Sequence, residues 1–253
     1  MKVMTYNIMS GGHGRIGLIL EVVQKESPDF LTINEAVGFE KTGVLEHVSS
    51  VARLPHFRLA CSEKYHVAIL SRFPFKNIKV IKPLMRAGII AEVETGLGDI
   101  AIVGVHLTPY TEDQRIREIN CILEQLDTYE LAVLMGDMNS LAQSDGYSDD
   151  IVATFTEVQL KKFTSDGRLR FDIINRILSR GYIDTAVSFG KHQQRTAPTS
   201  LNESGEHANM RLDYIFASKT LGRRVSSYTV VANPVSDKAS DHYPVTVVID
   251  TTP

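Results

Sequence analysis

Several features are scarce in this chain of 253 residues, and each absence excludes a class of protein. Its two cysteines, Cys61 and Cys121, are too few for a disulfide framework and stand in no metal-ligand spacing. We therefore expect free thiols in a reducing compartment. No apolar run approaches the roughly 18 residues that a membrane span needs, and no signal peptide precedes the first strand-like segment. These absences predict a soluble, cytoplasmic protein without a membrane span.

Excess charge of one sign is also lacking, because the net charge is only −3. No global basic field therefore attracts the protein to nucleic acid or to a membrane. The charge is uneven, however, since residues 161–195 carry eight Lys or Arg against three Asp, a local balance of +5. This segment either forms a solvated face or holds a polyanion at the rim of a cleft. The candidates for such a rim are Lys161, Lys162, Arg168 and Arg170.

The composition that remains is ordinary for a globular protein, with 43% hydrophobic and 23% charged residues. A chain of this length is ample for one large domain with a sizeable core. No internal repeat and no low-complexity linker divides it. We therefore predict a single domain over residues 1–253, and the sequence leaves its oligomeric state open.

Short strand-like runs rich in Val, Ile and Thr dominate the pattern. They lie at residues 2–8, 30–34, 67–71, 88–94, 99–107, 131–135, 212–218, 225–232 and 244–250. Helical periodicity is found at residues 15–26, 43–53, 112–126 and 170–181. Thr111 is placed to cap the third of these helices. Many strands with only a few intervening helices favour two packed sheets with outer helices.

A glycine pattern, Gly12-x-Gly14-x-x-Gly17, follows the first strand and precedes a helix. Together with Glu35, 23 residues after Gly12 and at the end of the next strand, it has the outline of a dinucleotide-binding fingerprint. This alternative predicts an oxidoreductase. Polar residues between the strand and the first glycine weigh against it, as does the lack of repeated βαβ units downstream. A flexible corner between strand and helix explains the glycines equally well.

Polar side chains stand at the ends of most of the strand-like runs. They are Asn7, Glu35, His106, Asp137, Asn139, Asp213, Asp241 and His242. Each alone is explained by a turn or a solvated rim. Together they place acid and amide groups beside the most buried strands, where an unpaired charge is costly. A shared cation would neutralise several of these carboxylates at once.

The type of ligand selects the metal. Glu35, Asp241 and Asn7 offer oxygen atoms and no thiolate, which suits Mg²⁺, with Mn²⁺ as an alternative. The imidazoles of His106 and His242 leave Zn²⁺ as a less favoured choice.

Taken in order, these residues resemble the motifs of the endonuclease/exonuclease/phosphatase superfamily, which has the deoxyribonuclease I-like fold. The likeness is carried by Asn7, Glu35, GDMNS, LDYIFAS and SDHYP, with further matches in VAILSRFPF and HLTPYTEDQRIREI. It spans residues 3 to 248. The resemblance implies an α/β fold with four layers, in which two packed mixed β-sheets are flanked by outer helices.

The resemblance also implies a chemistry, the hydrolysis of a phosphodiester or a phosphomonoester by in-line attack of an activated water. Glu35, Asn7 and Asp241 would hold the metal ion. Asp137 would orient or deprotonate the water, and Asn139 would donate to a phosphoryl oxygen. Such a transition state is anionic and needs cations and donors around it.

By the same resemblance, His242 would donate to the phosphate or transfer a proton, and Asp213 would fix the tautomer of its ring. His106 would be a second histidine for phosphate binding or proton transfer. Two further motif residues, Tyr110 and Arg72, are predicted to bind substrate.

In the segment SDHYP an acid and a histidine are neighbours. Because adjacent residues of a strand point to opposite faces, they can serve different partners. We expect Asp241 to reach toward Glu35 and the metal, and His242 to reach toward Asp213 and the phosphate.

The substrate is therefore expected to be a phosphate ester, and nucleic acid is one candidate. Abasic-site endonucleases of this family carry an acid and a tryptophan where this chain has Met9 and Tyr6, and usually a tyrosine in place of His106. These departures argue against that branch. A catalytically silent binding scaffold on the same fold is a further alternative, although the complete polar set argues against it.

Overall fold

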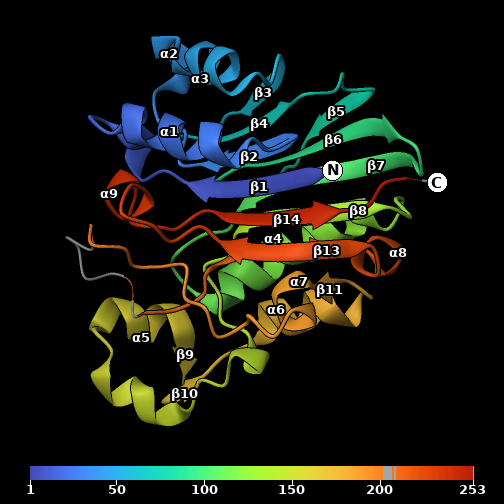
Figure 1. Cartoon of the computed structure of the whole chain (residues 1–253). Helices are drawn as coiled ribbons and strands as arrows, with labels where there is room; N and C mark the ends of the chain where they lie inside the picture. Colours follow the sequence, from blue (N-terminus) through green and yellow to red (C-terminus); the bar gives the residue numbers. More distant parts are fainter. Residues whose placement is uncertain (202–206, 208, 253) are drawn as a thin grey trace.

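The computed structural model describes residues 1–201, 207 and 209–252, and Figure 1 shows their arrangement. Two six-stranded mixed sheets form the centre of the molecule, with strand orders β13-β14-β1-β2-β4-β3 and β11-β12-β8-β7-β6-β5. Helices lie outside both sheets. This is the predicted architecture of two packed mixed sheets flanked by outer helices.

The first sheet is built around one parallel pair. β1 (Lys2–Asn7) and β2 (Phe30–Asn34) run in the same direction, with Asn7 opposite Asn34. The helix α1 (Ile16–Glu26) connects them. Antiparallel pairs complete the sheet through β3 (His56–Ala60), β4 (Val67–Ser71), β13 (Val225–Val230) and β14 (Val245–Ile249).

The second sheet repeats this arrangement. β7 (Gly98–His106) and β8 (Ala132–Asp137) are parallel and are joined by the helix α4 (Glu112–Leu126). The other strands are antiparallel to their neighbours: β5 (Asn77–Val80), β6 (Gly88–Thr95), β11 (Ile183–Asp184) and β12 (Asp213–Ala217). The carboxyl ends of two parallel pairs, one in each sheet, therefore come together at one edge of the molecule.

The core has three layers of apolar side chains, as expected for two sheets between helices. The inner layer lies between the sheets and includes Val3, Ile69, Ile102 and Val247. The second layer packs α1 and α3 (Val44–Ala52) on the first sheet, and the third packs α4 and α6 (Asp172–Ser179) on the second sheet. Thr111 caps α4 as predicted, because its side chain accepts a hydrogen bond from the backbone N–H of Gln114.

The smaller elements lie around these layers. They are α2 (Phe39–Thr42), α5 (Glu157–Phe163), α7 (Thr185–Ser188), α8 (Lys219–Gly222), α9 (Ser236–Ala239), β9 (Thr164–Ser165), β10 (Arg168–Leu169), and the 3-10 helices η1 (Ser10–Gly12), η2 (Gln143–Asp145) and η3 (Asp149–Thr154). None of the helices in the described part of the chain is long and apolar enough to cross a membrane.

Candidate active site

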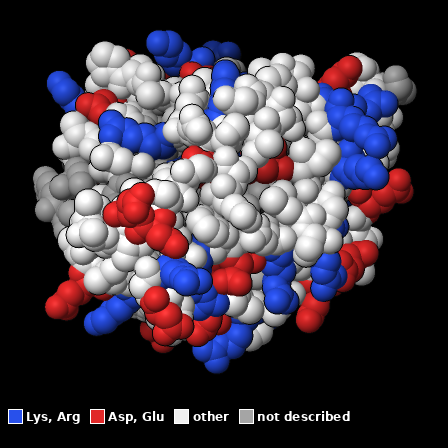
Figure 2. All heavy atoms as spheres, turned by 90° about the horizontal axis from the view of Figure 1, so that it is seen from below, with Lys and Arg blue, Asp and Glu red and all other residues white. Residues whose placement is uncertain are grey.

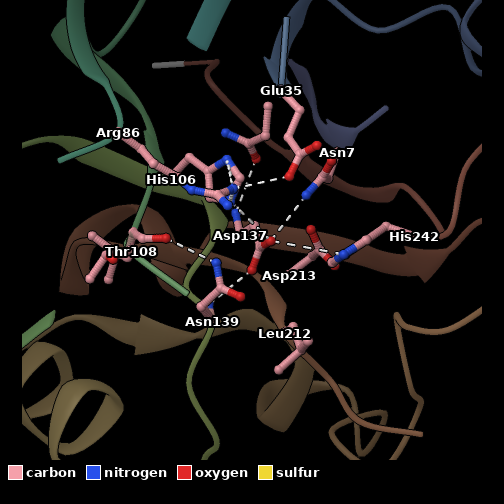
Figure 3. A network of polar contacts seen from close by, with 12 residues as sticks. Asn7, Glu35, Arg86, His106, Thr108, Asp137, Asn139, Leu212, Asp213 and His242 are labelled. Carbon is pink, nitrogen blue, oxygen red and sulfur yellow. Dashed lines mark hydrogen bonds and ion pairs between the residues drawn. The ribbon is translucent and has the colours of Figure 1, made fainter. Parts of the chain in front are cut away.

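Asp137, the last residue of β8, is the centre of a buried polar cluster (Figure 3). Its side chain is 2% exposed, and its Oδ2 atom accepts a hydrogen bond of 3.0 Å from Nδ2 of Asn7. Nε2 of His106 lies 3.3 Å from the same oxygen. The other oxygen, Oδ1, accepts from the backbone N–H of Asn139 at 2.9 Å. Strand pairing produces this convergence, because His106 on β7 and Asp213 on β12 are the residues directly opposite Asp137.

The backbone before Asp137 requires a glycine. Gly136 has φ +146°, a conformation that residues with a side chain rarely adopt. A Cβ atom at this position would lie 1.8 Å from the carbonyl oxygen of Val105 on the neighbouring strand. Gly136 thus permits the close approach of β7 that brings His106 beside Asp137.

Asn34 holds the backbone of Asp137 from the other sheet. Its side-chain oxygen accepts from the N–H of Asp137 at 3.1 Å, and its Nδ2 donates to the carbonyl of Val105 at 2.9 Å. Asn34 is fully buried at the end of β2. Sequence reasoning missed this residue, although its position at a strand end was a signal of the same kind as that of Asn7.

His242 and Asp213 form the second part of the cluster. Nδ1 of His242 lies 2.7 Å from Oδ2 of Asp213, and both side chains are buried. Nε2 of His242 is 3.9 Å from Oδ2 of Asp137, across the site. The carboxylate of Asp213 thus fixes the orientation of the ring and directs Nε2 toward Asp137.

The pKa values of the two histidines are shifted in opposite directions. Burial lowers the pKa of His106, and the neighbouring guanidinium of Arg86 lowers it further. Burial also opposes charge on His242, but the carboxylate of Asp213 outweighs it and raises the pKa of His242 to about 10. For Asp137, burial is outweighed by the hydrogen bond from His106 and the charge of His242, which hold its pKa well below the usual range. These shifts favour, at neutral pH, an ionised Asp137 between a neutral His106 and a protonated His242.

Glu35 lies at the more open side of the cluster, with 15% of its side chain exposed. Its Oε2 accepts from the backbone N–H of Ser10 at 2.8 Å, and its Oε1 accepts from Nη1 of Arg86 at 3.0 Å. The backbone N–H of Gly11 donates to the carbonyl of Glu35. The loop after β1 therefore holds Glu35 in place through the backbone N–H groups of Ser10 and Gly11.

Asp241 has other partners than expected. Its Oδ2 is 3.2 Å from Nε2 of His207, and its Oδ1 accepts from the hydroxyl of Ser240 at 3.3 Å. No hydrogen bond joins it to Glu35 among the residues that the structure describes. Asp241 and His242 lie in a bend before β14, so the alternation of side chains along a strand does not apply to them. They nevertheless contact different partners, His207 and Asp213.

The cluster offers ligands for a divalent cation. Ligand atoms of Asp137, Asp213 and His242 lie within 4.8 Å of one another, and so do those of His207, Asp241 and His242. Among the described residues, Oδ1 of Asp213 is buried without a hydrogen-bond partner, so this oxygen is available to a ligand. Carboxylate oxygens and imidazoles fit a divalent metal. The amide of Asn7 is already engaged by Asp137 and by the N–H of Met9, and it orients Asp137 directly.

Asn139 also has a partner within the protein. Its Nδ2 donates to the carbonyl of Leu107 at 2.9 Å, which leaves one N–H of the amide for another acceptor. Its backbone has φ +50°. The amide is 2% exposed and lies below Asp137, as Figure 3 shows.

The two other motif residues lie in different places. Tyr110 is 60% exposed and lines a cavity beside the cluster. Arg72 follows β4 and pairs with Asp29, which precedes β2, whereas Glu35 follows the last residue of β2. Because β4 is antiparallel to β2, the five residues of β2, about 16 Å of strand, separate Arg72 from the cluster. The structure thus does not bring Arg72 to the site as predicted.

The four basic residues predicted to form a rim do not act as one group. Lys162 is 3% exposed, and its charge is one of those that lower the pKa of Asp137 against the effect of burial. Arg170 forms ion pairs with aspartates of α4 and α6. Lys161 and Arg168 are exposed. The face seen in Figure 2 carries both signs of charge and broad uncharged areas.

Arg86 is the site residue that the sequence analysis missed most completely. It precedes β6, is 11% exposed at its side chain, and contacts both Glu35 and the ring of His106 through Nη1. An arginine before an ordinary strand carries no signal by itself, and its role becomes visible only when the strands are placed side by side (Figure 3).

Comparisons with known proteins agree with this geometry. The chain has the fold of an AP endonuclease from Archaeoglobus fulgidus, with 20% sequence identity and a TM-score of 0.75. It has the same fold as the 3' phosphatase NExo from Neisseria bound to a product DNA hairpin, with 17% sequence identity and a TM-score of 0.74. It also has the fold of a humanized D. rerio TDP2, with 16% sequence identity and a TM-score of 0.68. Each alignment covers 99% of this chain and 99% of the other.

At these identities the solved structures show the fold and do not select a branch of the family. No curated protein sequence gives a significant match. The model of the Endonuclease/Exonuclease/phosphatase family, however, matches residues 4–242, which include all the residues of the cluster around Asp137. The chain thus belongs to the endonuclease/exonuclease/phosphatase family of metal-dependent hydrolases that act on phosphate esters.

Proposed function

We propose that this protein is a Mg²⁺-dependent phosphodiesterase that cleaves nucleic acid by in-line attack of a water molecule. The observation that carries the proposal is the buried cluster in which Oδ2 of Asp137 lies 3.3 Å from Nε2 of His106 and 3.9 Å from Nε2 of His242. Mn²⁺ is the alternative cofactor.

Asp137 is placed to act on the attacking water. It is ionised and held in one orientation by Asn7, Asn139 and His106, so its free lone pairs are fixed in direction. A carboxylate fixed in this way orients a water and accepts its proton. The protonated His242 faces the same region and donates through Nε2 to a phosphoryl or leaving-group oxygen.

The metal site completes the chemistry. Glu35 and Asp241 are the more exposed carboxylates of the cluster, with 15% and 16% of their side chains accessible, and we assign them as the residues that hold the cation. A bound Mg²⁺ would neutralise the charge that develops on the phosphoryl oxygens. The carboxylate oxygens of Glu35 and Asp241 suit Mg²⁺ better than Zn²⁺.

Nucleic acid as the substrate is supported by two of the solved structures with this fold. One is an AP endonuclease, and the other is bound to a DNA hairpin. Abasic sites are not the substrate that we favour, because Met9 and Tyr6 stand where that branch has an acid and a tryptophan. Lys161 and Arg168 remain exposed cations that a longer strand could contact.

Cleavage of fluorescent single- and double-stranded DNA and RNA oligonucleotides, with Mg²⁺, Mn²⁺ or EDTA, tests the proposal. We expect cleavage with either cation and none with EDTA. Asp137→Asn should lower kcat by about 10²- to 10⁴-fold, the usual contribution of a general base.

Asp99→Asn is the matched control, because Asp99 is half exposed and forms its ion pair with Lys76, far from the cluster. It should retain the wild-type rate. Equal cleavage by the wild type and Asp137→Asn, or undiminished cleavage in EDTA, would show that the site is assigned wrongly. Activity on inositol phosphates but not on oligonucleotides would keep the chemistry and change the substrate.

A further inference from the structure

The guanidinium of Arg86 stands at the boundary between the cluster and a neighbouring cavity. On one side, Nη1 donates to Oε1 of Glu35 at 3.0 Å and contacts the ring of His106 (Figure 3). On the other side, Arg86 is one of the residues that line the cavity, which does not include Glu35 or His106. Arg86 therefore borders both the cluster and the cavity.

Arg86 has hydrogen-bond donors that no described residue engages. All its hydrogen bonds within the described part of the chain run through Nη1, so Nη2 and Nε have no protein partner there. The ring of Tyr65 lies against the guanidinium, with the central carbon of the group 4.1 Å from the ring centroid. This stacking fixes the plane of the guanidinium, which leaves its remaining N–H groups in a defined direction.

The segment that carries Arg86 is held by a buried acid. Glu118 on α4 accepts from the backbone N–H of Met85 at 2.8 Å through Oε1 and from that of Thr108 at 2.8 Å through Oε2. It thereby ties the chain just before β6 to the chain just after β7. The position of Arg86 next to His106 is thus built into the backbone and does not depend on its own ion pair alone.

The cavity has a volume of about 830 Å³, within the usual range for a site that takes a small organic group. Its walls come from residues 61–65, 80–87 and 109–110. Most of them are apolar, and two of them, Met85 and Tyr110, are 51% and 60% exposed to solvent. The charged residues of the lining are three cations and one acid: Lys64, Lys82, Arg86 and Glu63.

We infer that this cavity binds the nucleotide unit attached to the scissile phosphate, with the base against Tyr110 and Met85 and a phosphate oxygen on Nη2 and Nε of Arg86. The inference rests on the proposed function and adds a determinant of specificity to it. Arg86 acts as a substrate-binding residue, and Glu118 and Tyr65 act as residues that position it.

A nucleotide fits these observations better than other phosphate esters do. Its base is planar and largely apolar at its faces, which suits an exposed tyrosine ring and a methionine. Its phosphate is anionic, which suits the excess of cations in the lining. A polyol headgroup would place many hydroxyls against apolar walls, where they would lose hydrogen bonds to water.

Two ligands, each with one part removed, test the two halves of this site. Isothermal titration in Mg²⁺ would compare thymidine 5'-monophosphate with 2-deoxyribose 5-phosphate, which lacks the base, and with thymidine, which lacks the phosphate. The protein would carry Asp137→Asn so that nothing is consumed. We expect the monophosphate to bind at least about tenfold more tightly than either fragment, the effect of one stacked base or one charge-assisted contact.

Two variants in the same background should separate the contributions. Tyr110→Ala should bring the affinities for thymidine 5'-monophosphate and the sugar phosphate together. Arg86→Met should weaken the monophosphate about tenfold relative to thymidine, and Arg86→Lys should recover only part of this, because lysine has no planar fork. Phe73→Ala is the control, since Phe73 is similarly exposed, at 41%, and lies next to Arg72, away from the cavity.

Equal affinity for the monophosphate and the sugar phosphate would overturn the inference, as would tighter binding of inositol 1-phosphate. If Arg86→Met lowered the affinities for thymidine and for its monophosphate by the same factor, this result would also contradict the inference. Binding is measured apart from hydrolysis, so the two proposals can fail independently. A preference for the base without any cleavage by the wild type would contradict the proposed function alone.

Discussion

At the scale of single residues, the site contains two histidines on either side of one acid, and their pKa values are shifted in opposite directions. The difference has a structural cause, because His106 has a guanidinium beside it and His242 has a carboxylate. In the proposed mechanism the same type of side chain thus serves as a neutral group at one position and as a proton donor at the other. The partners of the histidines, Arg86 and Asp213, decide the chemistry as much as the histidines do.

Asp213→Asn tests this dependence. The amide would keep the shape of the side chain, but it would no longer stabilise the charge on His242 or fix its Nδ1–H. We expect kcat to fall by about 10²-fold or more, in the range for loss of a general acid. The change in KM should be smaller, because Asp213 is fully buried and its role in the proposed mechanism is to position His242.

The ¹⁵N resonances of the His242 ring, compared between the two proteins, would report its protonation directly. Asp99→Asn again serves as the control for loss of one acid. A protonated His242 at neutral pH in Asp213→Asn would contradict the role given to the carboxylate.

The residues of the cluster differ in how far sequence predicts them. Asp137 and His242 stand at the ends of apolar runs in a family motif, so their type, place and order were all informative. Arg86 and Asn34 have no such signature, since an arginine before a strand and an asparagine at its end are common features. Their roles arise from which strands become neighbours, which is a property of the fold. Arg72 shows the converse, because it lies in a matching motif but at the wrong end of its strand.

At the scale of the elements, two parallel strand pairs create the site. In each pair a helix returns the chain to the same end of the sheet, so that the carboxyl ends lie side by side. The pairing of β7, β8 and β12 then places three polar residues in one row. The register of these strands is therefore a requirement for activity and not only for stability.

Gly136→Ala should show how tightly that register is set. The new Cβ would lie 1.8 Å from the carbonyl oxygen of Val105, and the residue would keep a φ of +146°. We expect a loss of about 3 kcal/mol or more in the free energy of unfolding, measured by urea titration, because strain and overlap add. Cleavage activity should fall as well, since β7 must move away from Asp137.

Gly98→Ala separates the two causes. Gly98 also has a positive φ, +105°, but a Cβ there would meet no atom within 4 Å. Gly98→Ala should therefore lower the free energy of unfolding only by the part that comes from backbone strain. Equal losses in the two variants would show that contact with Val105 does not matter.

The elements themselves were predicted unevenly. The buried strands and the four longer helices are periodic enough to be found, with bounds within two residues of those observed. The strands β3 and β5 were missed, because they lie at sheet edges and mix exposed with half-buried residues. The helix α5 was missed as well, although Thr156 and Gln159 form a capping box at its start. The two-residue strands β9, β10 and β11 were also missed, because so short a run carries no recognisable pattern.

At the scale of the whole molecule, the site lies across the junction of the two sheets. The first sheet supplies Asn7 and Asn34, and Glu35 directly follows its strand β2. The second sheet supplies His106 and Asp137. The sheets face each other through apolar side chains over most of their area. At the edge that carries the site, the asparagines add direct polar bonds between them. Activity therefore requires the sheets to keep one relative position.

Asn34→Leu should weaken this junction, because leucine has a similar size but neither donates nor accepts hydrogen bonds. The N–H of Asp137 and the carbonyl of Val105 would each lose a buried partner, at about 1–3 kcal/mol per group. We expect the free energy of unfolding to fall by about 2–5 kcal/mol in urea titration. Cleavage should fall too, because Asp137 would lose its anchor on the first sheet. Asn77→Leu, in the exposed edge strand β5, should change stability by less than about 0.5 kcal/mol. If Asn34→Leu unfolded like the wild type and cleaved at the same rate, apolar packing alone would set the position of the sheets, and the asparagine would not contribute to it.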